Sequence, residues 1–313
     1  MTETTKTVFE RYEVRKTKAQ KAAFADYVRE VARENGYAFS VETGASGARN
    51  LVVGDVASAK AVYTAHYDTC AVMPFPNFIT PKNFLIYFLY QMVTAVFLYA
   101  PIFAFVYLVN RLALYYGVGE VARVILYELV LILGIVAVLY MIMAGPANKH
   151  TANDNTSGVT TLLDLMCSLP EEQRGKVAFI LFDLEERGLR GSKAYFSKHK
   201  AQMREKLLIN FDCVSDGEHI LLAVKKGAQK YLPLMERAFV SNGTYTVELA
   251  TKGVFYPSDQ ALFPCGVGVA ALKQSKNGKL LYMNRIHTKK DTVYNEKNIE
   301  FLVHGTLRLT ELL

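Results

Sequence analysis

Two long apolar stretches separate the two halves of this chain. Residues 84–109 form a run of 26 positions without a charged side chain, and residues 124–144 form a run of 21 positions with one, Glu128. At about 1.5 Å per helical residue, either run is long enough to cross the roughly 30 Å hydrocarbon core of a bilayer. Buried core helices are the alternative, but those are amphipathic, whereas these runs are apolar on every face. The pattern therefore predicts a transmembrane helical hairpin, inserted at residues 78–147.

The sequence on either side of the hairpin has the alternating pattern of an α/β domain. Short apolar runs predict strands, and longer runs with apolar residues at helical spacing predict helices. The expected strands are 50–53, 59–65, 177–184, 206–211, 220–224 and 266–272, and the expected helices are 14–35, 157–169, 192–200, 230–240 and 296–312. Strands that alternate with helices indicate a largely parallel central sheet. Residues 1–77 and 148–313 are thus expected to build one domain that the hairpin at 78–147 interrupts.

Charge and cysteine content narrow the class of partner and compartment. The chain carries a net charge of +7, and all of it lies outside the hairpin, because residues 84–145 contain two charges of each sign. Basic residues are interleaved with acidic ones along the chain, which fits attraction to a lipid bilayer with anionic headgroups and argues against a nucleic-acid partner. The four cysteines form no C-x-x-C pair. They are expected to be reduced, mostly buried thiols in a reducing compartment.

Candidate metal ligands fall at the ends of the predicted strands. His66, Glu186 and Asp212 lie at or just past the C-terminal end of a strand, and Asp154 lies just before a helix. In open α/β sheets this edge is where sites assemble. Each residue alone has an ordinary explanation, since Asp154, for example, would serve as a helix N-cap. The evidence for chemistry is therefore the set and not any one member.

The set has the composition of a two-metal hydrolytic site. Two zinc ions need about seven or eight protein donor atoms, mostly histidine nitrogen and carboxylate oxygen, and a bridging carboxylate lets the ions share one water. Glu185, beside Glu186, is left over, as a general base next to that water must be. Asp68 and Asp291 follow the two histidines closely and are expected to orient the imidazoles, so Asp68 is counted with Glu185 as catalytic. The residues expected to bind two Zn²⁺ ions are His66, Asp154, Glu186, Asp212 and His287.

These segments, in this order, resemble the co-catalytic di-zinc aminopeptidases of clan MH, the bacterial leucine-aminopeptidase type. Relatives of that type include glutamate carboxypeptidases and glutaminyl cyclases. The resemblance covers most of the chain outside residues 76–147 and implies a three-layer zinc-peptidase fold. The hairpin is the departure, because soluble relatives join H-x-D to the bridging aspartate by a short loop. The matching motifs are H-x-D at 66–68, N-D-N-x-S-G at 153–158, E-E-x-G-L-x-G-S at 185–192, F-D at 211–212, S-D at 258–259 and I-H-T-x-x-D-T at 286–292.

The resemblance also implies a role for each candidate residue. Asp154 would bridge the two metals and be followed by a cis peptide bond to Asn155. Glu185 would be the general base. One zinc would be held by Glu186 and His287, and the other by His66 and Asp212.

The activity that this implies is that of a membrane-anchored zinc exopeptidase, an aminopeptidase acting on the N-terminal residues of peptides. Substrate binding is assigned to Tyr256, Ser258 and Asp259, although relatives often continue S-D with histidine and this chain has Gln260. Two alternatives stay open. One is other amide chemistry at the same site, as in a carboxypeptidase, an amidohydrolase or a glutaminyl cyclase. The other is a non-catalytic membrane scaffold, which would be expected to have lost a ligand, and none is missing here.

The sequence also predicts how the chain would sit in a membrane. Two spans place the N-terminal part and the C-terminal part on the same side, as a single continuous domain requires. The first 20 residues contain no apolar core of a signal peptide. Lys82, Lys149 and the basic residues of the N-terminal segment lie on the domain side, while the connector has Arg111 and Arg123 against Glu120. By the positive-inside rule, the protein is expected to be an integral membrane protein with its catalytic domain in the cytoplasm.

Overall fold

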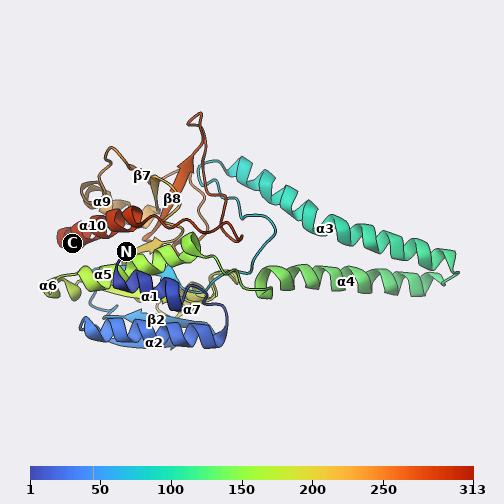
Figure 1. Ribbon diagram of the computed structural model, residues 1–313, viewed down its shortest axis with the longest axis horizontal. Helices are drawn as coiled ribbons and strands as arrows, with labels where there is room; N and C mark the ends of the chain where they lie inside the picture. Colours follow the sequence, from blue (N-terminus) through green and yellow to red (C-terminus); the bar gives the residue numbers. More distant parts are fainter. Residues whose placement is uncertain (45) are drawn as a thin grey trace.

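A nine-stranded mixed sheet organises the molecule, with the strand order β1-β2-β4-β3-β5-β8-β6-β7 and β9 paired to β8. The computed structural model describes residues 1–44 and 46–313 (Figure 1). The strands are β1 Phe39–Thr43, β2 Arg49–Val53, β3 Ala61–His66, β4 Val177–Phe182, β5 Leu207–Phe211, β6 His219–Val224, β7 Thr246–Ala250, β8 Gly266–Gln274 and β9 Leu281–Tyr282.

The α/β class predicted from the sequence is confirmed, and parallel strands form the centre of the sheet and its β6–β7 edge. β4, β3, β5 and β8 are neighbours with parallel pairing. The flanking pairs β1–β2, β2–β4, β6–β8 and β8–β9 are antiparallel. Two of these flanking pairs are hairpins with short connections, which only antiparallel strands can form. The carboxyl ends of the central strands therefore meet at one edge of the sheet.

Helices cover both faces of this sheet and give three layers. One face packs against α2, α5, α9 and α10, which share a core with the sheet through residues such as Phe24, Leu162 and Leu302. The other face packs against α7 and α8 through Tyr195 and Met203. The helices are α1 Glu3–Arg11, α2 Lys18–Glu34, α3 Phe84–Tyr115, α4 Glu120–Ala144, α5 Ser157–Ser168, α6 Glu171–Arg174, α7 Arg190–Lys198, α8 Lys200–Met203, α9 Leu232–Ala238 and α10 Glu296–Leu312.

The helix starts expected near the N-terminus and near residue 230 need correction. α2 begins at Lys18 and not at residue 14, because Thr17 and Gln20 form a capping box that fixes the first turn. The helix expected at 230–240 is divided into a 3₁₀ segment, Lys226–Tyr231, and α9. Pro233 favours a start at that point, since proline fits the first turn of a helix. α1, β1, β7 and β9 were not anticipated from the sequence.

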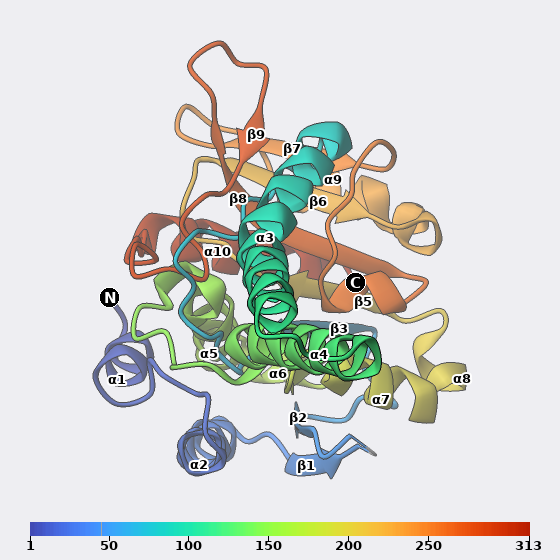
Figure 2. The same ribbon diagram turned by 90° about the vertical axis from the view of Figure 1, so that its right-hand side faces the viewer.

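The two apolar stretches form helices α3 and α4, which project together from one side of the domain (Figures 1 and 2). Both are longer than predicted, so the turn at the tip is only residues 116–119. Their mean hydropathies are 2.2 and 2.6, and only 6% of the most apolar window of each is buried. The helices approach closely at Gly134, where a Cβ atom would lie 2.5 Å from Cγ2 of Ile102. These are two helices long and apolar enough to cross a membrane.

The base of the hairpin is built into the domain beside the sheet edge. Ile79 pairs with Met283 in an antiparallel bridge, and the main-chain N–H of Met73 donates to the carbonyl of His287 at 2.7 Å. On the return side, the N–H of Val72 donates to the carbonyl of Pro146 at 2.9 Å. The hairpin is therefore joined to the same loops that carry the candidate site.

Candidate metal centre

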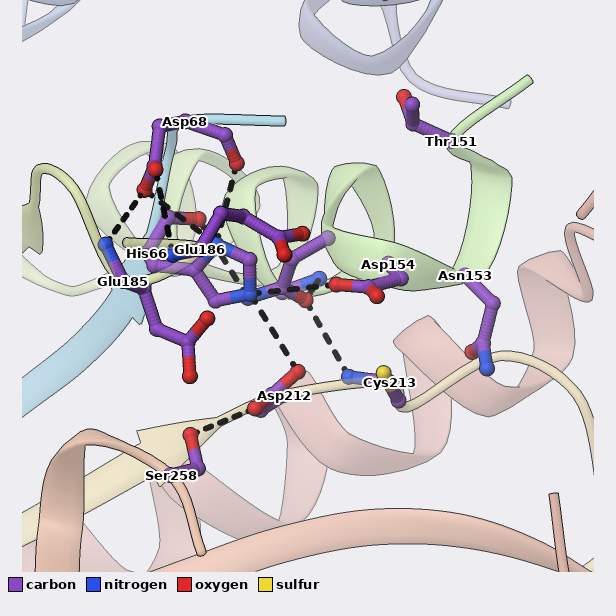
Figure 3. A network of polar contacts seen from close by, with 12 residues as sticks. His66, Asp68, Thr151, Asn153, Asp154, Glu185, Glu186, Asp212, Cys213 and Ser258 are labelled. Carbon is purple, nitrogen blue, oxygen red and sulfur yellow. Dashed lines mark hydrogen bonds and ion pairs between the residues drawn. The ribbon is translucent and has the colours of Figure 1, made fainter. Parts of the chain in front are cut away.

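The predicted ligands converge at the carboxyl edge of the central strands. His66 is the last residue of β3, Glu186 lies in the turn after β4, and Asp212 directly follows β5. Asp154 lies in the π-helical turn Ala152–Thr156 that leads into α5. His287 comes from the loop after β9. Figure 3 shows the side chains of His66, Asp154, Glu186 and Asp212 around a common centre.

Asp154 stands between two imidazoles, with one carboxylate oxygen toward each. Its Oδ1 lies 3.3 Å from Nε2 of His66, and its Oδ2 lies 3.1 Å from Nε2 of His287. The same nitrogen of His66 is 3.5 Å from Oδ1 of Asp212, and that of His287 is 3.3 Å from Oε2 of Glu186. Burial alone would raise the pKa of Asp154, but the two imidazoles outweigh it and lower that pKa below its ordinary value.

The glutamate pair is positioned through its main chain. The carboxylate of Asp68 accepts hydrogen bonds from the N–H of Glu185 at 3.0 Å and of Glu186 at 3.3 Å (Figure 3). His66 contacts Asp68 through Nδ1, 3.1 Å from the main-chain oxygen and 3.7 Å from the carboxylate. Among the described residues, the carboxylate of Glu185 has no hydrogen bond or ion pair. Asp68 thus contacts both the turn after β4, which carries the glutamate pair, and the imidazole of His66.

Asp291 also acts on the backbone. Its carboxylate accepts from the N–H of Asn153 at 2.9 Å and of Asp154 at 3.0 Å. The sequence predicted a contact with His287, whereas the hydrogen bonds of this carboxylate to the described part of the chain go to the turn that carries Asp154. The two side chains still interact through their charges, because Asp291 is one of the groups that raise the pKa of His287.

The segment assigned to substrate binding supports Asp212 from behind. The hydroxyl of Ser258 donates to Oδ2 of Asp212 at 2.5 Å, and that of Tyr256 donates to the main-chain oxygen of Asp212 at 2.8 Å. Gln260, which stands where relatives often have histidine, is buried and donates to the carbonyl of Tyr256 at 2.8 Å. Asp259 differs from these neighbours, because it is fully buried and neither of its carboxylate oxygens has a partner among the described residues.

Several residues that hold the site together carried no recognisable signal in the sequence. Asn155 donates to the carbonyl of Phe211 at 3.0 Å, and Asn153 accepts from the N–H of Ser215 at 2.8 Å. Arg15 is fully buried beneath the site and donates to the main-chain oxygen of Tyr67 at 2.6 Å. The asparagines belong to the N-D-N motif, but their partners are far away in sequence. A single arginine in a charged N-terminal segment gives no hint of burial.

The backbone takes unusual conformations next to the ligands. Leu184, Cys213 and His287 have φ values of 57°, 56° and 64°, in the left-handed region. A non-glycine residue there costs on the order of 1–3 kcal/mol, and such residues cluster at functional sites. The peptide bond from Asp154 to Asn155 is cis, as the resemblance implied.

Four carboxylic acids in and around the site have raised pKa values. Burial raises the pKa of Glu186 to about 8 and those of Asp259 and Asp291 to about 7. Burial also raises the pKa of Glu185 well above its ordinary value. Burial would lower the pKa of His287, but the charge of Glu186 and the contact with Asp154 outweigh it and raise the pKa to about 9. Raised pKa values of both the buried acids and His287 mean that the cluster favours protonation, as a site with too little positive charge does.

The residues present fit a metal site. Oε1 of Glu186 and Oδ1 of Asp212 are buried without a hydrogen-bond partner among the described residues. Orphaned buried carboxylate oxygens are costly unless a cation satisfies them. The donor atoms of His66, Asp154 and Asp212 lie within 4.8 Å of one another. Nitrogen and carboxylate oxygen are the donors that zinc accepts in catalytic sites.

Comparisons with solved structures place the fold among zinc peptidases and glutaminyl cyclases. The chain is similar to the glutaminyl cyclase of Porphyromonas gingivalis (TM-score 0.59, 15% identity, 99% of this chain and 97% of that chain). It is also similar to the LapA aminopeptidase of Legionella pneumophila, with a TM-score of 0.56 and 13% identity over 99% of this chain and 67% of that chain. A Zn-dependent exopeptidase of Parabacteroides distasonis has the same fold, with a TM-score of 0.54 and 15% identity over 98% of this chain and 97% of that chain.

The family itself follows from the sequence. No curated protein sequence matches the chain significantly. The description of peptidase family M28, in contrast, matches residues 138–307, which is more than half of the 313 residues. That span contains Asp154, Glu186, Asp212 and His287. It agrees with the resemblance to clan MH peptidases seen in the motifs, and the chain therefore belongs to peptidase family M28.

Proposed function

We propose that this M28 peptidase is a membrane-anchored zinc aminopeptidase with two metal ions per chain. The observation that carries the proposal is the position of Asp154, whose two oxygens face His66 and His287 at 3.3 and 3.1 Å. A carboxylate that presents one oxygen to each of two imidazoles has the arrangement of a bridging ligand. A di-metal site needs such a bridge.

In this proposal each metal is held by three groups, one of them shared. His66 and Asp212 would hold one ion with Asp154, and His287 and Glu186 would hold the other with Asp154. When bound, two zinc ions would supply a bound water of pKa near ~7 and polarise the scissile carbonyl. The hydroxyl of Ser258 and the main-chain contacts of Asp68 and Asp291 would keep these ligands in place.

Glu185 would act as the general base of the reaction. Its carboxylate has no partner among the described residues, while its main chain is held by Asp68 at 3.0 Å. It would take a proton from the attacking water and deliver that proton to the amine that leaves. Burial raises the pKa of this carboxyl, which is the direction that suits a group passing protons near neutral pH.

Membrane anchoring is supported by the exposure of the two apolar helices. A core helix of a soluble protein would be mostly buried, whereas only 6% of the apolar window of α3 or α4 is buried. Large apolar side chains such as Phe97 and Val121 are 73% and 76% exposed. Hydrocarbon is the environment that would cover them.

The experiment that tests the proposal combines metal analysis with a substrate panel on detergent-purified full-length protein. The panel contains free-N-terminus peptides, the same peptides with an acetylated N-terminus, and a peptide that begins with glutamine. We expect two zinc ions per chain and hydrolysis of the free peptides only. Cyclisation of the glutaminyl peptide with one zinc per chain would establish a glutaminyl cyclase instead. Cleavage of the acetylated peptides from the C-terminus would establish a carboxypeptidase.

A further inference from the structure

A cavity of about 290 Å³ joins the candidate metal centre to the hairpin. Its walls include the metal-centre residue His287, the segment Met73–Asn77, and residues of both projecting helices. The helix residues that matter most here are Ala95, Leu98 and Tyr99 of α3 and Ile142 of α4. The side chain of His287 is 24% exposed, which is the most exposed of the proposed ligands. The cavity thus has one of the proposed metal ligands in its wall.

The shape of the hairpin leaves this cavity between the helices. α3 and α4 meet at the tip and diverge toward the domain (Figure 1). α3 and α4 pack closely where Ile102 meets Gly134, and the buried Val106 and Val138 lie four residues from this contact, Val106 toward the tip and Val138 toward the domain. Toward the domain the two helices diverge, and there the cavity is lined by Leu98 of α3 and Ile142 of α4. Its lining is mainly aliphatic and aromatic.

The cavity lies at the depth where the bilayer surface would fall. A hydrocarbon core of roughly 30 Å corresponds to about 20 helical residues. Counted back from the tip-side end of α3 at Tyr115, this distance reaches about Ala95. Counted forward from the start of α4 at Glu120, it reaches about Tyr140. The cavity-lining residues Ala95 and Ile142 therefore lie near the domain-side boundary of the apolar layer.

The cavity wall is also linked mechanically to the metal centre. Tyr90 of α3 donates a hydrogen bond to the carbonyl of Pro76 at 2.6 Å and packs its ring against Phe78. In the same short segment, the main-chain N–H of Met73 donates a hydrogen bond to the carbonyl of His287 at 2.7 Å. A group that fills the cavity would touch both the membrane helices and the loop that carries His287.

We propose that this cavity binds the apolar part of a peptide substrate at the bilayer surface, while its terminal residue reaches the metal centre. The substrates are then apolar peptides that partition into the membrane. The inference rests on the proposed aminopeptidase function. A volume of about 290 Å³ is at the lower end of the ~300–1,000 Å³ of small-molecule pockets. It accommodates a few apolar side chains and not a folded protein.

The first test fills the cavity. Ala95→Phe places a large side chain in it, and Ala100→Phe is the matched control, because Ala100 is exposed on the same helix and is not part of the cavity. Activity is measured in liposomes on two peptides with the same N-terminal leucine, one continuing with Ser and Gly and one with Leu and Phe. We expect Ala95→Phe to lower kcat/KM for the apolar peptide by ~10–200-fold and to leave that for the polar peptide within about twofold. Equal effects on both peptides, or no effect, would overturn the proposal.

The second test does not depend on turnover. In the Glu185→Gln protein, an apolar peptide with a photoreactive leucine should label residues 90–99, and adding Ala95→Phe but not Ala100→Phe should abolish the labelling. Labelling elsewhere, or labelling unaffected by Ala95→Phe, would mean that the cavity holds a lipid chain or nothing, and the proposal fails. If wild-type protein cleaves neither peptide while residues 90–99 are labelled, the aminopeptidase function fails and the apolar peptide site stands.

Discussion

At the scale of single residues, Asp154 carries the architecture of the site. Its two oxygens face different imidazoles, and its N–H is held by Asp291. Removing this carboxylate should therefore affect both metals. We expect Asp154→Ala to lower the zinc content from two ions per chain to well below one, while His287→Ala should mainly empty one site. Elemental analysis of dialysed protein measures both. One remaining zinc in Asp154→Ala would contradict a bridging role.

Glu185 is predicted to be required for turnover and dispensable for metal binding. Its neighbour Glu186 is the member of the pair that faces His287, at 3.3 Å. Glu185→Gln should lower kcat by ~10²–10⁴, the usual cost of losing a general base, with zinc content near that of the wild type. Glu186→Gln is the matched control and should lose zinc. If the two variants behave in the opposite way, the roles of the pair must be exchanged.

The titration of the buried groups predicts how stability depends on pH without metal. Burial raises the pKa of Glu186 to about 8 and that of Asp291 to about 7, and the pKa of His287 is about 9. These groups bind protons more tightly folded than unfolded, so the stability they contribute is present at low pH and is lost as the pH rises through these values.

At about 1.4 kcal/mol per pKa unit, we expect the Tm of chelator-treated protein to fall on the order of 10 °C between pH 5 and pH 8. Zinc replaces the protons and should flatten this dependence. Differential scanning fluorimetry in detergent measures both conditions. The lowered pKa of Asp154 acts in the opposite direction, but only below about pH 4. Metal-free protein that is more stable at pH 8 than at pH 5 would refute this account.

The sequence indicated the candidate metal ligands but, among the residues that support them, only Asp68 and Asp291. His66, Asp154 and Asp212 could be found because strand ends and short motifs are local features. Gln260 could not be interpreted, because its role depends on contacts with Tyr256 and Asn210 that only the folded chain brings together. Arg15 was missed for the same reason.

At the scale of elements, the ends of the hairpin helices show the limit of hydropathy. The sequence placed a 14-residue connector between the runs, because Arg111, Glu120 and Arg123 interrupt the apolar pattern. The structure continues both helices through these residues, since arginine and glutamate are good helix formers and do not break a helix. Strand β1 was missed because it is an edge strand whose residues are exposed or only partly buried, so its apolar pattern is weak.

The hairpin is predicted to be removable without loss of the fold. Residues 78–83 belong to the domain by their contacts, because Ile79 pairs with Met283 and Thr80 is buried. We therefore expect that replacing 84–144 with a short Gly/Ser loop gives a soluble protein with wild-type zinc content. Replacing 78–147 is the comparison, and it should fold less well because it removes the Ile79 bridge. Solubility, zinc content and circular dichroism decide between them. Aggregation of the shorter replacement would show that the hairpin is part of the fold.

At the scale of the whole molecule, the arrangement of the hairpin constrains topology. Both helices leave from and return to one side of the domain (Figure 2), so the two halves of the peptidase lie on the same side of any membrane that the hairpin crosses. The net charge of +7 belongs to the domain and not to the hairpin. The positive-inside rule applies to basic residues close to the spans and not to net charge. Lys82 and Lys149 are such residues on the domain side, and Arg111 and Arg123 lie near the tip. A cytoplasmic domain is therefore a prediction that labelling has to decide.

Cysteine labelling in intact cells tests this orientation. The background should be Cys167→Ser, because Cys167 is exposed whereas Cys70, Cys213 and Cys265 are buried. In that background we expect Gly117→Cys, at the tip of the hairpin, to react with a membrane-impermeant maleimide, because the tip would lie outside. Asn277→Cys, exposed in the β8–β9 loop, should react only after the cells are permeabilised, because the domain would be cytoplasmic. Labelling of Asn277→Cys in intact cells, with Gly117→Cys protected, would reverse the orientation. Labelling of both only after permeabilisation would show that the hairpin does not cross the membrane.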